Sequence, residues 1–270
     1  MKTCLINQPA GIGDIMYTIQ IGRFFAAKGY RVIWPVIKQY HWLSRYIDCD
    51  NEIKFVAEDE DFPMKDLYLS SHKEICCRRG TLYIPLKKST LSSLGSRYPL
   101  MLSKYAMVGL TSRSKRWHTA FNINRDHICE KRVEEYYDLL PQQDFIFCNT
   151  LIGSPDGHMI PLQDMRDTIT SIKAKSNDLR ILENEFVNDT TIFDFIGILA
   201  SASELHLPNS ALAWIAEYLA VKNMSRDDQR RFCYPRDRGN PINDNWKYLK
   251  GCWNEENWIL TQPKPISRDQ

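Results

Sequence analysis

The start of the chain contains two strand-like segments joined by a glycine turn and a helix. Residues 3–7 form a β-prone run, and residues 14–28 carry apolar side chains at helical spacing. Gly29 is suited to end that helix, because glycine tolerates the left-handed backbone found just past many helices. Residues 30–34 then have the composition of a second strand. A strand, a helix and a strand in this order make a right-handed crossover between parallel strands, so the sequence predicts a doubly wound α/β domain.

A second alternation of strands and helices follows a polar break at residues 141–143. The continuous apolar run at 145–148 is typical of a buried parallel strand. Shorter strand-like and helix-like segments fill the rest of each half. Further strands are expected at 52–56, 66–69, 81–84, 179–182 and 204–207, and helices at 41–47, 100–108, 128–140, 162–175, 192–201 and 209–221.

This pattern predicts two α/β domains, since 270 residues allow two domains of modest size. We expect one Rossmann-like domain at 1–140, a second at 141–235, and a tail at 236–270 that packs back on the body. The two Rossmann-like domains are expected to face a cleft. The tail contains three tryptophans that are suited to anchor it, namely Trp246, Trp253 and Trp258.

Charge and hydropathy exclude several classes of partner. Lysine and arginine number 35 against 33 aspartates and glutamates, a balance unlike that of a nucleic-acid-binding protein. No stretch approaches the roughly 18 apolar residues of a membrane span, and the start of the chain lacks a signal-peptide core. The eight cysteines include no C-x-x-C pair. We therefore expect a cytoplasmic protein with reduced thiols, no membrane span and no nucleic-acid partner.

The first candidate site is the turn between the first strand and the first helix. Gly11, Ile12 and Gly13 form a loop that a ligand can approach closely, and Asp14 follows in the first helical turn. The turn lacks the third glycine of a dinucleotide fingerprint and the Gly-Lys-Ser/Thr of a phosphate-binding loop. Asp14 is either a plain helix-capping acid or a functional carboxylate at the carboxyl edge of a parallel sheet.

The second candidate site is the start of the helix at 209–221. A strand runs into Pro208, Asn209, Ser210 and Ala211, so free backbone N–H groups at this helix start can bind an anion. A plain helix cap is the alternative interpretation. We assign Asn149 and Thr150, which follow the strand at 145–148, to the same nucleotide-binding site. Basic side chains that could assist are Lys173, Lys175 and Arg180.

Both sites resemble segments of known families. The segment from Gln8 to Ile15 resembles the start of the ADP-heptose:lipopolysaccharide heptosyltransferase family, in which a Gly-Asp pair occupies this turn and the Asp is the proposed base. Residues 194–219 resemble that family's donor-diphosphate segment and, equally, an Asn-Ser segment of α-1,2-fucosyltransferase-like enzymes. The chain departs from the heptosyltransferases at Ala211 and Trp214, where they have Gly and His, so the sugar stays open.

The resemblance implies a two-domain (GT-B type) glycosyltransferase. It would move a sugar from a nucleotide-sugar donor, held by the carboxyl half, to a glycan or glycoconjugate hydroxyl held by the amino half. Asp14 would be the general base of an inverting reaction, and Gly11, Ile12 and Gly13 would leave room for the acceptor. No metal or other cofactor is expected, because helix N–H groups can bind the diphosphate.

Two alternatives remain open. One is a non-catalytic module that binds nucleotides or glycans. The other is a single-domain, metal-dependent glycosyltransferase, whose metal would be held by Asp48 and Asp50 or by Asp59 and Asp61. Both aspartate pairs lie in acidic loops rather than directly after a buried strand, which favours solvated turns.

Overall fold

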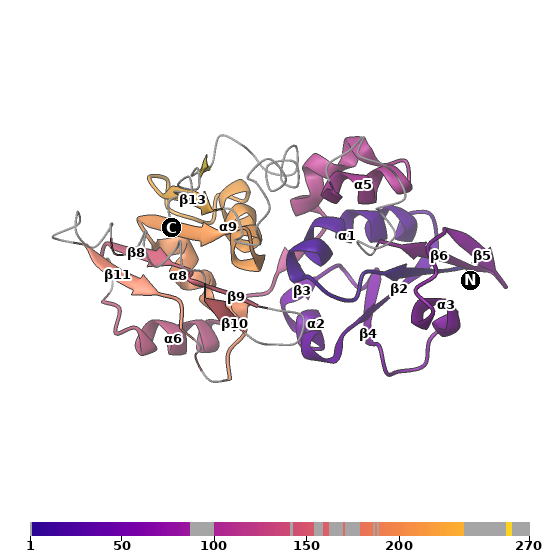
Figure 1. The fold of residues 1–270 in the computed structure, drawn as a ribbon, viewed down its shortest axis with the longest axis horizontal. Coiled ribbons are helices and arrows are strands. Elements are labelled where there is room, and N and C mark those ends of the chain that lie inside the picture. Colours follow the sequence, from indigo (N-terminus) through magenta and orange to yellow (C-terminus); the bar gives the residue numbers. More distant parts are fainter. Residues whose placement is uncertain are drawn as a thin grey trace, which may run out of the picture. The chain divides into compact units, whose positions relative to one another are not determined.

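The computed structural model forms two compact units, and the described part of the chain divides between Asn124 and Arg125. The structure describes residues 2–86, 100–140, 143–153, 159–161, 170, 179–185, 187, 189–234 and 258–260. Each unit contains a five-stranded sheet with helices packed against it (Figure 1). The chain is therefore a pair of Rossmann-like α/β units, as the sequence predicts.

The sheet of the first unit has the strand order β4-β2-β1-β6-β5. Its strands run parallel except for β5 at the edge, which is antiparallel to β6. The chain passes from β1 to β2 and β4, then crosses to the other side of β1 to form β6, so a topological switch point lies between β1 and β6. The strands are β1 (Lys2–Asn7), β2 (Tyr30–Val36), β4 (Ile53–Ala57), β5 (Cys76–Arg78) and β6 (Thr81–Pro85).

Helices pack on both faces of this sheet. Helix α1 (Ile12–Ala26) contacts α5 (Leu100–Met107) and the 3₁₀ segment η3 (Thr111–Thr119). Figure 1 shows α1 and α5 together on one side of the sheet and α3 (Lys65–Leu69) on the other. The smaller elements are η1 (Lys38–Tyr40), α2 (Leu43–Tyr46) and an antiparallel pair, β3 (Ile47–Asp48) and β7 (Asn122–Ile123).

Aromatic packing fixes α5 against α1. The Tyr105 hydroxyl donates a hydrogen bond to the Tyr17 carbonyl at 2.5 Å, and the two rings meet edge to face with their centroids 5.0 Å apart. The Trp117 ring of η3 lies 6.4 Å from the Tyr17 ring. All three side chains are buried, so the position of every residue on α5 is set relative to the start of α1.

The sheet of the second unit is parallel, with the strand order β11-β8-β12-β13-β14. The chain places β11 on one side of β8 and then β12 on the other, so the switch point of this sheet lies between β8 and β12. Its strands are β8 (Phe145–Cys148), β11 (Arg180–Glu183), β12 (Glu204–Pro208), β13 (Arg230–Tyr234) and β14 (Ile259–Leu260). Its described helical elements are α6 (His127–Tyr136), η4 (Ile192–Phe195), α8 (Ile196–Ser201) and α9 (Ala211–Val221). Outside the sheet, β9 (Leu151–Gly153) pairs antiparallel with β10 (Met159–Pro161).

Helix α6 belongs to the second unit, which explains why the division precedes the expected boundary at 140. It packs against α8 and η4. The contact is close at Gly197, where an added Cβ would lie 2.5 Å from Glu134 Oε1. The helix before the polar break at 141–143 thus packs one face on the second unit, and the division between Asn124 and Arg125 comes before this helix.

The strand expected at 66–69 is instead the short helix α3. Leu67 and Tyr68 are adjacent and both buried in one cluster with Leu5 and Tyr83 of the sheet. Neighbouring residues of a strand point to opposite faces, whereas one helical turn can bury both on the same side. Met64 begins this helix in the left-handed region, with φ 61°.

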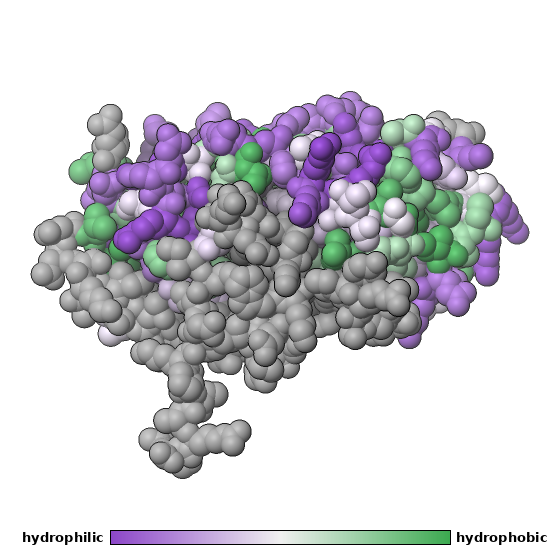
Figure 2. All heavy atoms as spheres, turned by 90° about the horizontal axis from the view of Figure 1, so that it is seen from above, coloured by the Kyte–Doolittle hydropathy of each residue, from purple (hydrophilic) through white to green (hydrophobic). Residues whose placement is uncertain are grey.

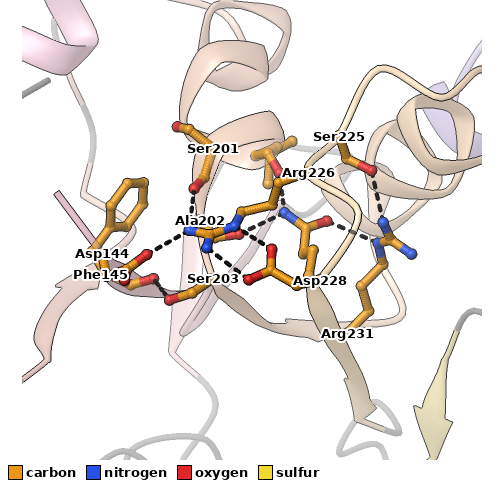
Figure 3. A network of polar contacts seen from close by, with 11 residues as sticks. Asp144, Phe145, Ser201, Ala202, Ser203, Ser225, Arg226, Asp228 and Arg231 are labelled. Carbon is orange, nitrogen blue, oxygen red and sulfur yellow. Dashed lines mark hydrogen bonds and ion pairs between the residues drawn. The ribbon is translucent and has the colours of Figure 1, made fainter. Parts of the chain in front are cut away.

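A polar network holds the amino end of the second sheet (Figure 3). Arg226 donates to both carboxylate oxygens of Asp228, at 2.6 and 2.9 Å, and to Asp144 at 2.6 Å. Gln229 donates to two carbonyl oxygens at the end of α8, both at 2.8 Å. The last carbonyls of a helix have no partner within the helix, and Gln229 supplies hydrogen bonds to two of them. These bonds fix the end of α8 to the loop before β13.

The tail is described only at residues 258–260. Trp258 is buried, and its indole N–H donates to Glu217 Oε2 of α9 at 2.7 Å. Trp246, Trp253 and the helix expected at 162–175 lie outside the described residues, apart from Thr170.

No helix within the described ranges is long and apolar enough to cross a bilayer. Figure 2 shows one face of the molecule, where hydrophilic side chains cover most of the described surface and apolar side chains gather mainly at the right of the view.

Candidate functional site

Gly11 shapes the turn between β1 and α1. It is the N-terminal cap of α1 and has a left-handed backbone with φ 81°. Its carbonyl accepts a hydrogen bond from the Ile15 N–H at 2.9 Å, and a Cβ added at Gly11 would lie 2.9 Å from Asp14 Oδ2. A side chain here would therefore strain the backbone and press on the carboxylate. Ile12 and Gly13 are both buried in the first turn of α1.

Asp14 forms an ion pair with Lys104, a residue that sequence reasoning missed. The Asp14 side chain is 27% exposed, whereas the Lys104 side chain is 1% exposed. The Lys104 ammonium donates to Asp14 Oδ1 and, at 2.7 Å, to Gln8 Oε1. Gln8 is the residue directly after β1, so its contact with Lys104 places the ion pair at the carboxyl end of β1, which borders the switch point of the first sheet. A single lysine within the apolar helix 100–108 was the sequence signal for this contact.

Tyr40 closes the other side of the turn. It lies beyond the carboxyl end of β2, and its hydroxyl is hydrogen-bonded to the backbone of Gly11. Burial raises the pKa of Tyr40; the Gly11 hydrogen bond lowers it, and the negative charge of Asp14 adds to the rise. Tyr40 is therefore a neutral hydroxyl at physiological pH, held beside the Asp14 carboxylate.

Buried amides and a hydroxyl converge at the carboxyl edge of the second sheet. Asn184, which follows β11, donates through Nδ2 to Asn149 Oδ1 at 2.8 Å. Asn149, which follows β8, donates through Nδ2 toward Ser210 Oγ at 3.4 Å. These three side chains and Thr150 are all at most 8% exposed. The structure thus brings Asn149 and Ser210 together at the switch point, and it adds Asn184, for which the sequence carries no distinguishing motif.

The start of α9 differs from that of α6 in how it is capped. Asp126 caps α6 with its own carboxylate, which accepts from the N–H groups of Ile128 and Cys129. Ser210 is the N-terminal cap of α9, with an extended backbone, but its side chain makes no capping bond. Ala211 is the first helical residue of α9. The N–H groups of this first turn carry the positive end of the helix dipole and suit an anion.

Asn209 lies at the carboxyl edge of the second sheet, whereas Arg180 lies at its amino edge. Asn209 is buried at the end of β12, and its N–H donates to the Tyr234 carbonyl at 3.0 Å. Arg180 lies at the opposite, amino end of β11, where its guanidinium donates to the carbonyls of Tyr137 and Asp138 at the end of α6. Arg180 is therefore not at the anion site. Lys173 and Lys175 lie outside the described residues.

The aspartate pairs proposed as metal ligands serve other contacts or face solvent. Asp48 Oδ1 accepts from the Asp50 N–H at 2.8 Å, and Asp50 pairs with Arg23 at 2.8 Å. Asp59 and Asp61 are exposed. Across the part of the chain that the structure describes, no group of three or more histidine, cysteine or acidic side chains could hold a metal ion.

His206 lies beneath the second site, in the middle of β12. Its ring stacks on Phe232 at 4.5 Å, and its carbonyl accepts from the Asn149 N–H at 2.9 Å. Nδ1 contacts the Tyr234 hydroxyl at 2.7 Å, and Nε2 contacts Glu204 at 3.3 Å. Burial lowers the pKa of His206 from 6.5 to about 4, so the ring is neutral at physiological pH.

We expect this buried histidine to make the protein acid-sensitive. Between pH 6.5 and 4 the unfolded chain binds a proton at His206 that the folded chain does not, so stability falls as pH falls through this window. The full effect is about 3 kcal/mol. Chemical denaturation at several pH values should show a shallower pH dependence for His206→Gln than for the wild type. The exposed-site variant His41→Gln is the control and should keep the wild-type slope. An unchanged slope in His206→Gln would contradict the assignment.

Two Rossmann-like units in one chain are the architecture of the GT-B glycosyltransferases, and the resemblance noted in the sequence therefore extends to the fold. A solved glycosyl transferase family 9 structure from Veillonella parvula has a similar fold, with a TM-score of 0.52 and 10% identity over 98% of this chain and 88% of that one. At this identity the likeness concerns the fold.

Two further solved structures align with lower scores. One is the E. coli ADP-heptose lps heptosyltransferase II, with a TM-score of 0.47 and 9% identity over 97% of this chain and 90% of that one. The other is the iron-containing dodecameric glycosyltransferase TibC from enterotoxigenic E. coli, with a TM-score of 0.48 and 11% identity over 87% and 58% of the two chains. No protein-family model and no curated protein sequence matches the chain.

Proposed function

We propose that this chain is an inverting glycosyltransferase that moves a sugar from a nucleotide-sugar to a hydroxyl of a glycan or glycoconjugate. The proposal rests on the groups that lie at the switch points of the two sheets. In the first unit this point holds a part-exposed carboxylate, Asp14, and in the second it holds a helix start without a side-chain cap beside Ser210. Ligands of doubly wound sheets bind at such points. The fold likeness to a family 9 glycosyl transferase supports the same class.

The chemistry assigns one role to each site. Asp14 accepts the proton of the acceptor hydroxyl while its oxygen attacks the anomeric carbon from the face opposite the leaving diphosphate. The bond to the diphosphate breaks in the same step, so the configuration at the anomeric carbon is inverted. The departing diphosphate gains negative charge, which the N–H groups from Ala211 onward and the dipole of α9 stabilise. Asn209, Asn149 and Thr150 line the nucleotide side, and Gly11, Ile12 and Gly13 line the acceptor side.

We propose that transfer needs no metal ion, because helix N–H groups take the place of a cation beneath the diphosphate. The TibC structure is described as iron-containing, which makes the point worth a direct measurement. Prolonged dialysis against a chelator is expected to leave the transfer rate within about twofold of the untreated rate. If activity is lost and returns on adding a divalent metal, metal independence is wrong.

A screen of nucleotide-sugars tests the class of protein itself. Release of nucleoside diphosphate, measured with ADP-, GDP-, UDP- and CDP-sugars and a mixture of glycan acceptors, should rise above background for at least one donor. Binding of a nucleotide-sugar without turnover in any combination would instead indicate a non-catalytic binding module.

We also place the reaction in the cytoplasm. The cysteines that the structure describes are free thiols, and most of them are buried. Free, scattered cysteines are typical of a reducing compartment.

A further inference from the structure

Lys104 is a charged residue of the apolar helix α5, and its side chain is almost completely buried. Its side chain is 1% exposed, and lysine is almost never buried to this extent unless its ammonium is paired. Its neighbour Tyr105 fixes α5 to α1, so Lys104 has little freedom to move. The ammonium contacts Gln8 Oε1 and Asp14 Oδ1.

Gln8 is itself held in one orientation. Its Nε2 donates to the Ala10 carbonyl at 2.5 Å, which turns Oε1 toward Lys104. Its own carbonyl accepts from the Trp34 indole at 2.9 Å. Trp34, Gln8 and Lys104 are therefore buried side chains linked by hydrogen bonds that fix their orientation. Asp14, at the end of this series, is 27% exposed.

Stability alone is a poor reason for this arrangement. Removing an ammonium from water costs several kcal/mol, and a buried ion pair often stabilises a fold no more than apolar side chains of similar volume would. Methionine has nearly the length of lysine and would fill the same space without that desolvation cost. The ion pair does one thing that methionine cannot do, which is to hold the Asp14 carboxylate by one oxygen.

We infer that Lys104 is the positioning residue of the Asp14 carboxylate. This inference rests on the proposed function, in which Asp14 takes the acceptor proton. Lys104 fixes the direction of the carboxylate and balances its charge before the reaction. When Asp14 accepts the proton, the contact to Gln8 Oε1 still holds the Lys104 side chain in place. Lys104 is thus not a proton donor and does not touch the substrate.

The experiment compares Lys104→Met with Lys104→Arg. A positioning role and a space-filling role predict opposite orders of activity for these two variants. Arginine keeps the positive charge but is bulkier, whereas methionine keeps the shape but loses the charge. Positioning predicts that kcat falls about 10- to 100-fold in Lys104→Met, less in Lys104→Arg, and that the KM for the donor is unchanged in both. A space-filling role predicts that Lys104→Met is the more active variant.

The controls separate this inference from folding and from the proposed function. Lys131→Met removes an exposed lysine and should behave as wild type. Gln8→Leu removes the hydrogen bond from the ammonium to Gln8 but keeps the ion pair, and it should lower kcat several-fold even if either Lys104 variant fails to fold. Wild-type kcat in a folded Lys104→Met or in Gln8→Leu overturns the positioning role while the enzyme stands. A wild-type protein that transfers no sugar overturns the proposed function and the positioning role with it.

Discussion

Asp14→Asn is expected to lower kcat by two or more decades. Asparagine keeps the size of the side chain, but it cannot take a proton at neutral pH. General-base assistance is worth roughly 10²–10⁴ in rate, and the KM for the donor should stay near the wild-type value because the donor is proposed to bind in the other unit. Initial rates at saturating donor and acceptor measure the effect.

Because Asp14 pairs with Lys104, the same substitution is also expected to lower the stability of the fold. Asparagine removes the negative charge of Asp14 from beside a 1% exposed ammonium, which is expected to destabilise the fold by about 3 kcal/mol. The double variant Asp14→Asn/Lys104→Met removes both charges and should recover much of that stability without recovering activity. Thermal unfolding and kinetics together therefore separate catalysis from folding. If the folded Asn variant transfers sugar at close to the wild-type rate, Asp14 is not the base, and the acidic residues at 58–66 become the next candidates.

The alternation of elements was predictable because each strand is a short apolar run and each helix has its own periodicity. The turn around Gly11, the strand at 145–148 and the helix at 209–221 all carry such local signals, and the structure has β1, α1, β8 and α9 at these places. Topology then brings their ends together, since the carboxyl ends of parallel strands share one edge. This is why Asn149 and Ser210, far apart in the chain, could be assigned to one site.

Lys104 and Asn184 could not be identified as site residues from the sequence. Lys104 stands out in the sequence as a lone lysine in an apolar helix, but its partner does not, because Lys104 reaches Asp14 through the packing of α5 on α1 by Tyr105 and Tyr17. Asn184 is a polar residue just after a strand, like many residues in loops. Its role becomes visible once β11 pairs with β8 and its amide meets Asn149. The same non-local packing explains the domain division, because the buried face of α6 packs on η4 and α8 of the second unit.

The largest effect on donor binding is expected from Ser210→Phe. The hydroxyl of Ser210 makes no capping bond to α9, so the first-turn N–H groups are available to a diphosphate, and a phenyl ring at this position would exclude it. Loss of two hydrogen bonds to a charged phosphate costs about 3 kcal/mol or more, which weakens nucleoside diphosphate affinity roughly 10²-fold. Calorimetric titration with ADP, GDP, UDP and CDP measures this change, and thermal unfolding checks that the variant is folded.

Two matched variants decide whether that loss reflects a binding site or damage to a helix start. Ser210→Ala keeps the space open and should retain affinity within about tenfold, because the backbone N–H groups carry most of the interaction and the hydroxyl adds about 1.5 kcal/mol at most. Asp126→Ala removes a genuine cap from α6, and it should lower stability by about 1 kcal/mol while leaving affinity unchanged. If α9 needed Ser210 only as a cap, Ser210→Ala would resemble Asp126→Ala in stability. Nucleoside diphosphate affinity that survives intact in a folded Ser210→Phe would remove the start of α9 from the donor site.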